Sequence, residues 1–555
     1  MSSTTARTAR TVVIGIDGVS HDILKHYVDA GELPCIASAA RRGSFSMLRS
    51  VMPPASPPAW TTITTGVNPG KHGIFDFVQH NPRTLQRRLV SSRDVRVRRF
   101  YHYAGDHGRT CCVANVPITY PPEPVPGSLI TGMLTPDGAE SFTYPSSLGR
   151  ELLEAVPEFR VGPSASYSVE RRDEYLEYLL HTVEQRGRVA LHLFERHPAD
   201  LFFFVFMESD HASHKLWGPF NGETMSWGTS RGPFHPGLLR VLQGIDGYIG
   251  ALVERMDEGD SLVMLSDHGN GPQRGLVNVN RWLVRQGLLR PRRGPLALAK
   301  LALTKMDLVA RTYRLLARVG LGRVVDLFPR DFRLHAFNAF QSLDKAIDWQ
   351  RTRAYLACSC PGIHVNLSGR QPYGCVQPGA DYDEVCRQVI EAVLAMRDEE
   401  GRPIVANAVL GRDVYDGPCA GDLPDILLEP VDHVFGVSKR LGLDSGPIIE
   451  KNPKGITGGH DPYGFLIASG PAVRTGSRAE GASLVDIAPT LLYLMGCPVP
   501  EYMDGRVLAD MLDPAHLARC PVRKDAATGP SGEQNRDTID EGQDVLERLQ
   551  DLGYM

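Results

Sequence analysis

The sequence predicts an α/β fold built on a largely parallel β-sheet, and two patterns support this prediction. Short apolar runs recur along the chain and alternate with stretches of helical periodicity, which is the order expected of β-α-β units. The apolar runs are continuous, as in strands that are buried on both faces. The candidate strands span residues 11–16, 110–115, 201–207, 261–266 and 464–468.

A long helix is predicted over residues 236–256, where apolar residues recur at three- and four-residue spacing. Leu238, Leu242 and Ile245 would form the face that packs on the sheet. We assign residues 10–285 and 345–515 to one discontinuous core, in which helices flank the sheet.

Residues 287–345 interrupt this core and differ from it in composition. From residue 290 to residue 333 the chain carries eleven Lys or Arg against three Asp. Arg311 and Arg314 lie on one face of a candidate helix and Leu315 on the other. We predict a basic helical cap insertion, which is either solvated or a lid over an anionic substrate; a membrane-surface helix is the less favoured alternative.

The segment 521–555 is predicted to be a tail outside the core. Residues 521–540 are rich in Gly, Ser, Asp and Glu, which is typical of a loose linker. Residues 544–552 have the spacing of a short amphipathic helix that could pack back on the core.

The composition is that of an ordinary globular protein, with 60 Lys and Arg against 64 Asp and Glu. A dedicated nucleic-acid-binding protein would carry a strong basic excess, so we expect no nucleic-acid partner. No apolar stretch approaches the length of a transmembrane helix, and the apolar run after residue 10 is too short for a signal peptide. The ten cysteines form no paired CxxC motifs, so we expect reduced thiols and a cytoplasmic location. The oligomeric state is left open.

An Asp-His pair closes one of the predicted strands. Asp267 and His268 follow the run 261–266, and ligands of open α/β sheets bind at the carboxyl ends of strands. The same letters recur at Asp106 and His107, but that pair precedes its strand, so Gly108 is interpreted as a helix C-cap there.

Three other places repeat the pattern of Asp or His at a strand end. Asp17 follows the first strand, Asp210 and His214 follow the run 201–207, and His460 lies on a Gly-rich loop that enters the run 464–468. Each residue alone has a structural explanation, such as capping or a buried, satisfied histidine. Together they provide nitrogen and oxygen ligands without thiolates, which suit Zn²⁺, Mn²⁺ or iron and suffice for two ions.

Ser56 is the candidate nucleophile. It lies between Ala55 and two prolines, just ahead of a Thr-rich run, and could be the N-cap of a helix. The alternative uses the same position: a hydroxyl at a helix N-terminus and near a metal ion is one where an alkoxide can form.

These motifs resemble the alkaline phosphatase superfamily. The residues that carry the likeness are Asp17-Gly18, Ser56 with Thr65-Gly66 and Pro69-x-x-His72-Gly73, Asp210-x-x-x-His214, Asp267-His268-Gly269 and His460. The closer likeness is to the type I phosphodiesterase/nucleotide pyrophosphatase branch and its predicted phosphohydrolase and phosphomutase relatives. It covers residues 10–515 and implies an alkaline-phosphatase-like core.

The resemblance implies two divalent metal ions, Zn²⁺ first and Mn²⁺ second. One ion would be held by Asp210, His214 and His460. The other would be held by Asp17, Asp267 and His268 together with Ser56, which would form a covalent phosphoserine intermediate. We expect hydrolysis of a small-molecule phosphate ester, by a phosphodiesterase or a phosphatase.

Two departures from the wider superfamily narrow the range of expected substrates and reactions. Nucleotide pyrophosphatases usually carry Thr as nucleophile and a phosphate-contacting Asn, and no motif here places that Asn. Sulfatases need Arg where this chain has Trp60, which argues against formylglycine chemistry. Trp60 could instead pack over the leaving group or in the core. A phosphomutase or phosphotransferase is the main alternative; a sulfatase or a non-catalytic interaction protein is less favoured.

Overall fold

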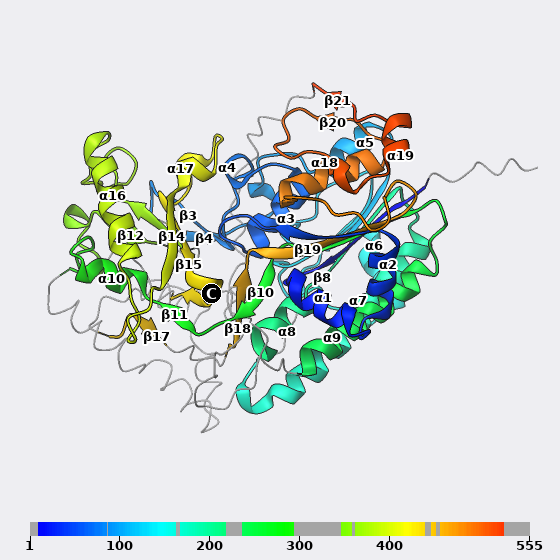
Figure 1. Ribbon diagram of the computed structural model, residues 1–555, viewed down its shortest axis with the longest axis horizontal. Helices are drawn as coiled ribbons and strands as arrows, with labels where there is room; N and C mark the ends of the chain where they lie inside the picture. The colour runs from blue at the N-terminus through cyan, green and yellow to red at the C-terminus, as the bar shows by residue number, and fades with distance from the viewer. Residues whose placement is uncertain are drawn as a thin grey trace, which may run out of the picture.

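An eight-stranded β-sheet forms the centre of the structure, a computed structural model that describes residues 9–85, 87–162, 167–217, 236–292, 346–357, 361–438, 446–450, 456–526 and 545 (Figure 1). The strand order is β2-β19-β9-β1-β8-β5-β6-β7. Two strands, β19 and β7, run against the others. The strands are β1 (Thr11–Ile16), β2 (Ser44–Arg49), β5 (Cys111–Val116), β6 (Gly127–Thr131), β7 (Thr143–Tyr144), β8 (Leu201–Phe206), β9 (Ser261–Leu265) and β19 (Tyr463–Ser469).

The prediction of a mostly parallel sheet is therefore confirmed, and its five predicted strands all form. β1 has the predicted bounds, β8 and β9 each end one residue earlier than predicted, and β5 and β19 differ from the prediction by one residue at both ends. Three strands, β2, β6 and β7, were not predicted. The predicted helix 236–256 is α9 (Pro236–Val253).

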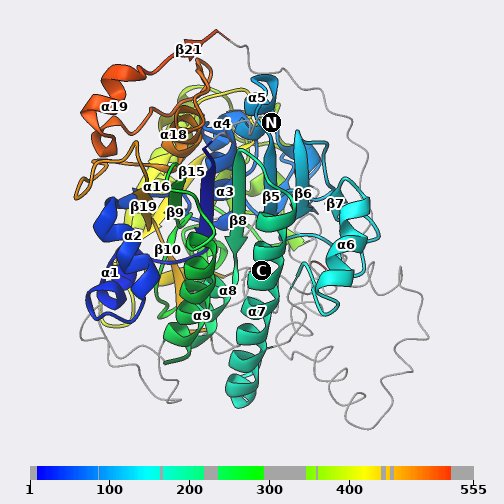
Figure 2. The same cartoon turned by 90° about the vertical axis from the view of Figure 1, so that its right-hand side faces the viewer.

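Helices cover both faces of the sheet, because the strand residues alternate between two buried clusters. Val13, Phe203 and Val263 belong to one cluster, and Val12 and Phe204 to the other. The first cluster includes residues of α3 (Ser56–Thr65), α5 (Phe100–Asp106) and α18 (Ile487–Leu494). The second includes residues of α1 (His21–Asp29), α2 (Pro34–Arg42), α6 (Ser147–Ala155), α7 (Arg172–Arg196) and α9, and Figure 2 shows α7 and α9 side by side on that face.

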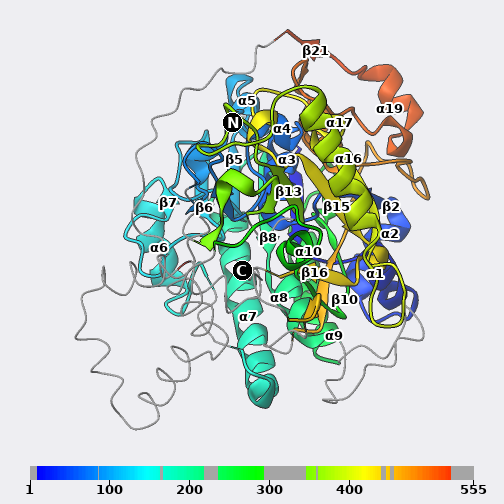
Figure 3. The same ribbon diagram turned by 90° about the vertical axis from the view of Figure 1, so that its left-hand side faces the viewer.

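A second, smaller sheet lies beside the first (Figures 1 and 3). Its order is β12-β13-β15-β14, all neighbours are antiparallel, and α16 (Ala380–Leu394) packs against it with its own buried cluster. The strands are β12 (Ala354–Leu356), β13 (Gly362–Val365), β14 (Val405–Leu410) and β15 (Ile426–Pro430). The helix α10 (Val279–Arg285) leads from the core to this sheet, and α17 (Gly411–Val414) follows β14.

Short elements complete the part of the chain that the structure describes. They are α4 (Pro69–His72), β3 (Val78–His80), β4 (Arg87–Leu89), α8 (Glu208–Leu216), β10 (Gly269–Pro272), β11 (Gly275–Val277), β16 (Phe435–Val437), β17 (Ile449–Glu450), β18 (Gly458–Asp461), β20 (Val499–Pro500), α19 (Pro514–Arg519) and β21 (Lys524–Asp525).

Most of the predicted cap, 287–345, lies outside the described residues, so its helical nature stays a prediction. In the predicted tail, β21 pairs with β20, and Val545 is buried in the cluster that contains α3 and α18. Within the described ranges, every helix is too short or too polar to traverse a bilayer.

Candidate active site

The carboxyl ends of three adjacent strands supply most of the candidate site residues. Asp17 follows β1, Asp267 and His268 follow β9, and Asp210 lies in the first turn of α8, directly after β8. β1 lies between β8 and β9 and is parallel to both, so the three strands end at one edge of the sheet. The site therefore forms where the apolar runs end.

His460 reaches this edge by a different route. It lies in β18, which pairs with β10 so that His460 is opposite Asn270, two residues after His268. The next strand, β19, is antiparallel to β9, so its beginning lies at the carboxyl end of β9. The sequence predicted a flexible loop at His460, whereas the structure has a short paired strand.

The first group of candidate metal ligands contains Asp210, His214 and His460. One ligand atom from each residue lies within 4.8 Å of the other two. The Nε2 atoms of the two histidines are 3.0 Å apart, and Nε2 of His214 lies 3.5 Å from Oδ2 of Asp210. Asp210 and His214 are four residues apart on α8, so both project from one face of that helix.

The second group contains Asp17, Asp267 and His268, all fully buried. Nε2 of His268 lies 3.4 Å from Oδ2 of Asp267 and 3.7 Å from Oδ1 of Asp17. The two groups adjoin each other, because the ring centroids of His268 and His460 are 4.1 Å apart.

The three histidines present the same tautomer to the site. Each Nδ1 lies within hydrogen-bonding distance of a backbone carbonyl oxygen: His214 with Gly458 at 3.0 Å, His268 with Gly269 at 2.9 Å and His460 with Pro54 at 2.7 Å. A carbonyl only accepts, so Nδ1 carries the proton and Nε2 keeps its lone pair. This second contact fixes the ring orientation in many metal-ligating histidines.

The electrostatics of the site favour a bound cation. Burial raises the pKa of Asp17 and Asp267 well above the ordinary carboxyl value, and nearby carboxylates add to the effect. The pKa of Asp210 is lowered: burial raises it, but the surrounding histidines, His214 foremost, outweigh burial. Oδ2 of Asp267 is buried without a hydrogen-bond partner among the described residues. The converging Nε2 lone pairs and this orphaned oxygen fit divalent metal ions.

Ser56 lies against the second group. It is the first residue of α3, and its N-cap is Ala55. The hydroxyl makes no cap hydrogen bond; Oγ donates to Oδ1 of Asp17 at 3.4 Å and lies 3.2 Å from Nε2 of His268. The interpretation of Ser56 as an N-cap is therefore wrong, because its side chain points to the carboxylates and not to the helix amides.

Two further residues support the site: Trp60, for which the sequence left packing over the leaving group or in the core open, and Asn270, to which it assigned no role. Trp60 is fully buried and donates its indole N–H to Oδ2 of Asp17 at 2.6 Å, so it packs in the core beneath the site. Asn270 donates to Oδ1 of Asp210 at 2.7 Å and to the carbonyl of Gly18. The position of Asn270, just after Asp267-His268-Gly269, was the one available signal.

The second Asp-His pair is remote from the site, as its place in the sequence predicted. Asp106 ends α5, His107 is the C-cap, and Gly108 has a φ of +75°. Asp106 pairs with Arg98, and Nε2 of His107 lies 3.7 Å from Asp525. This pair is a helix terminus at the opposite edge of the sheet.

Comparison with known proteins identifies the family of the chain. The model of the type I phosphodiesterase/nucleotide pyrophosphatase family matches residues 11–444. The chain is 21% identical to human ectonucleotide pyrophosphatase/phosphodiesterase family member 1 over 285 residues, half of this chain and 25% of that protein. It is 46% identical over 50 residues to the 2,3-bisphosphoglycerate-independent phosphoglycerate mutase of Cereibacter sphaeroides, 9% of each protein. The matches thus span a quarter or less of these curated relatives.

A solved structure shares the fold at low sequence identity. Phosphonoacetate hydrolase from Sinorhizobium meliloti 1021, in complex with phosphonoformate, superposes with a TM-score of 0.51 at 13% identity, covering 88% of this chain and 95% of that one. Murine ectonucleotide pyrophosphatase/phosphodiesterase 5 gives a TM-score of 0.49 at 12% identity, with 91% and 100% covered. The predicted alkaline-phosphatase-like fold is confirmed. The chain belongs to the type I phosphodiesterase/nucleotide pyrophosphatase family.

Proposed function

We propose that this protein hydrolyses a small-molecule phosphate ester with the help of two divalent metal ions and through a phosphoserine at Ser56. One observation carries the proposal: the Ser56 hydroxyl lies within 3.4 Å of Asp17 and 3.2 Å of His268, beside a second Asp-His-His group. A nucleophile next to two adjoining groups of three N/O ligands is the arrangement that two-metal phosphoryl transfer requires.

The ligand atoms divide into two sets. Asp210, His214 and His460 would hold one ion. Asp17, Asp267, His268 and Ser56 would hold the other, and the donors favour Zn²⁺, with Mn²⁺ second. When bound, the ions supply positive charge to the phosphoryl oxygens and lower the pKa of the Ser56 hydroxyl.

The chain itself positions the nucleophile rigidly. Ser56 is fully buried at the start of a ten-residue helix whose residues are all buried. Pro57 and Pro58 favour the helical φ but have no N–H, so the first turn of α3 offers few amide donors to an anion. The helix dipole still favours negative charge at Ser56. We infer that charge compensation for a phosphoryl group comes mainly from the two ligand groups.

Phosphoryl transfer to a second alcohol is the alternative, and the 50-residue match to a phosphoglycerate mutase favours keeping it. A mutase and a hydrolase would share the nucleophile and both ligand groups. They differ in the acceptor that takes the phosphoryl group from Ser56. Adding a primary alcohol such as glycerol to the assay separates them: a hydrolase releases inorganic phosphate, whereas a transferase forms the new ester.

The decisive experiment pairs metal analysis with activity. Ser56→Ala should abolish turnover of p-nitrophenyl phosphate and bis(p-nitrophenyl) phosphate while both bound ions remain. His214→Ala and His460→Ala should each bind one metal ion fewer than the wild type. His107→Ala, at the remote Asp-His pair, should change neither quantity. Activity that survives Ser56→Ala would assign the nucleophile elsewhere, and an unchanged metal content in both histidine variants would disprove the ligand division.

A further inference from the structure

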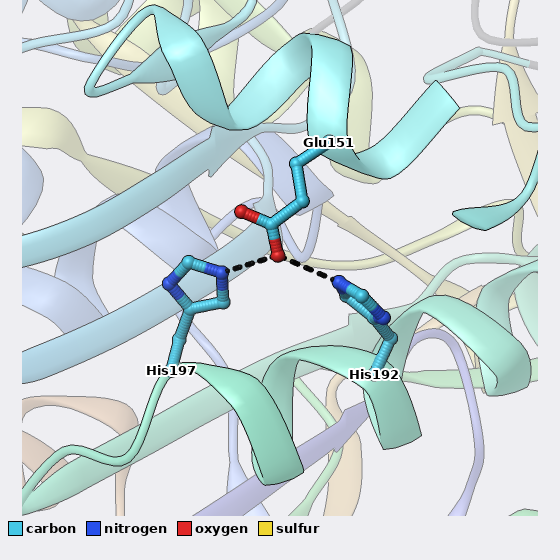
Figure 4. Close-up of side chains that lie close together, drawn as sticks. All are labelled: Glu151, His192 and His197. Atoms are coloured by element: carbon cyan, nitrogen blue, oxygen red, sulfur yellow. Dashed lines mark hydrogen bonds and ion pairs between the residues drawn. The ribbon is translucent and has the colours of Figure 1, made fainter. Parts of the chain in front are cut away.

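Three further residues converge near the amino ends of the strands, away from the candidate active site. The Glu151 carboxylate on α6 points between the rings of His192 and His197 (Figure 4). Oε1 of Glu151 lies 2.8 Å from Nε2 of His192 and 2.9 Å from Nε2 of His197. The three ligand atoms all lie within 4.8 Å of one another.

The end of α7 creates this convergence. Residues five apart on a continuous helix point about 140° away from each other, because each residue turns the helix by about 100°. His197 is the C-cap of α7, with φ −121° and ψ 64°, so the chain leaves the helix there. This departure turns the His197 ring back toward His192, which lies on the last helical turns.

The group is charged and reachable from solvent. The side chains of His192, Glu151 and His197 are 22%, 41% and 26% exposed. The hydrogen bond from His197 lowers the pKa of Glu151, burial opposes this, and the hydrogen bond from His192 adds to it. The carboxylate is therefore ionised at neutral pH, and it has two imidazole nitrogens beside it.

We propose that Glu151, His192 and His197 form a third metal site, which binds Zn²⁺. Two imidazole nitrogens and one carboxylate oxygen are a donor set that zinc accepts with a fourth position left to water. Mg²⁺ and Ca²⁺ require oxygen ligands and are excluded by this set. Bonds of about 2.1 Å place tetrahedral ligand atoms roughly 3.4 Å apart, so Oε1 of Glu151 needs to move about half an ångström away from each Nε2.

Zinc would replace the two hydrogen bonds that join the group without it. Each neutral ring would move its proton from Nε2 to Nδ1, so the nitrogen that now faces Oε1 becomes the ligand and no proton is lost. Rotation of the three partly exposed side chains is enough to move the ligand atoms apart by this distance, because these atoms already lie within 4.8 Å of one another.

The position of this site makes it structural and not catalytic. His197 lies four residues before β8, at the amino end of that strand, whereas Asp210 follows its carboxyl end. Six residues of β-strand span about 20 Å, so an ion here cannot contact a substrate at Ser56. A bound ion would instead join α6 to the end of α7, and so add to the contact in which Arg188 of α7 donates to the carbonyl of Ala155 on α6.

The test compares zinc binding by full-length variants. Metal-free protein is loaded with excess Zn²⁺, passed through a desalting column and analysed for zinc per chain. The double variant His192→Ala/His197→Ala should retain one zinc fewer than the wild type and hydrolyse p-nitrophenyl phosphate at the wild-type rate. Glu151→Gln, which keeps an oxygen acceptor for both histidines but loses the charge, should also lose this ion. A structural hydrogen-bond role alone would leave the zinc content of Glu151→Gln unchanged.

The control is His181→Ala on the same helix, since the His181 side chain is 55% exposed and its ion pair among the described residues is with Glu184. It should retain the wild-type zinc content. Equal zinc content in the wild type and the double variant would overturn the proposal. The difference in zinc content between the wild type and the double variant does not depend on whether the Ser56 site binds metal. This test and the test of the proposed function can therefore fail separately.

Discussion

The indole N–H of Trp60 donates to Oδ2 of Asp17 across 2.6 Å, and both side chains are fully buried. The other oxygen of the same carboxylate, Oδ1, accepts from Ser56. Trp60 therefore orients a proposed metal ligand through a direct hydrogen bond, on the same helix that carries the proposed nucleophile four residues earlier.

Replacing Trp60 by Phe should weaken the site more than the fold. The variant keeps an aromatic ring but removes the only hydrogen bond that holds Oδ2 of Asp17 among the contacts described. Loss of such a supporting contact typically costs 10- to 100-fold in metal affinity or activity, and we expect a loss of about that size. Metal titration and steady-state kinetics measure it.

Ile63→Val is the matched control, since Ile63 is also fully buried on α3. It should lower stability by about 0.5–1.5 kcal/mol and leave metal affinity unchanged. Equal metal affinity in Trp60→Phe and wild type would show that Asp17 is positioned without the indole.

Gly18→Ala should abolish binding at the Asp210 group. Gly18 has a φ of +66°, and a Cβ there would lie 2.3 Å from Oδ1 of Asp210 and 2.4 Å from Nδ2 of Asn270. Asp210 and Asn270 would have to shift to relieve the overlap, which displaces one member of the Asp210 group. We expect loss of one bound ion and of phosphatase activity, measured by metal analysis and turnover.

Gly31→Ala separates this overlap from backbone strain. Gly31 has a similar φ of +77°, but no atom lies within 4 Å of its added Cβ among the described residues. It should cost about 1–2 kcal/mol of stability and leave activity intact. If the two glycine variants lost the same metal content and activity, backbone strain and not contact with Asp210 would explain the effect of Gly18→Ala.

Stability should fall in mild acid because of two buried histidines between β3 and the second sheet. Burial lowers the pKa of His364 to about 3, and burial together with His364 and two arginines lowers that of His80 to about 2. Both rings bind protons near pH 6.5 when unfolded but not when folded, so unfolding is favoured as the pH falls from about 6.5 toward 3. Each contributes about 1.4 kcal/mol per pH unit in that window.

His364→Phe removes one of the two titrating rings, so the free energy of unfolding should depend less steeply on pH. The variant keeps an aromatic ring that can stack on Tyr355. Chemical denaturation between pH 7 and pH 4 gives the slope directly. Tyr355→Phe, which loses the hydroxyl near Nε2 of His80 but keeps both imidazoles, should preserve the slope. Parallel slopes for His364→Phe and wild type would contradict the assignment.

Asp425→Ala should destabilise the second sheet. Its carboxylate accepts from both terminal nitrogens of Arg370, from Tyr382 and from the amide of Val365, at 2.6–2.9 Å. Removing one member of a fully buried ion pair typically costs about 3–5 kcal/mol; we expect a loss toward the lower end, because the Arg370 side chain is 17% exposed. Denaturant titration should show that loss. Asp383→Ala, whose ion pair with Arg412 is mostly exposed, should cost under about 1 kcal/mol.

The sequence predicted the edge of the sheet that carries the site, because strands buried on both faces are continuous apolar runs. Asp17, Asp210 and Asp267 each follow such a run, so their shared edge could be predicted. The position of His460 at the same edge could not be predicted. It depends on β19 being antiparallel to β9 and on β18 pairing with β10, and both pairings are long-range. The second sheet was missed because its strands are short and only partly apolar, and the contact of Trp60 depends on packing geometry.

The antiparallel course of β19 also sets the order in which the site can assemble during synthesis. Asp17, Ser56, Asp210, His214, Asp267 and His268 all precede residue 270, whereas His460 is made nearly 200 residues later. A nascent chain thus holds the Asp17 group and Ser56 complete while the Asp210 group still lacks its third member. All members of the Asp17 group are therefore synthesised before β18 and β19, which complete the Asp210 group.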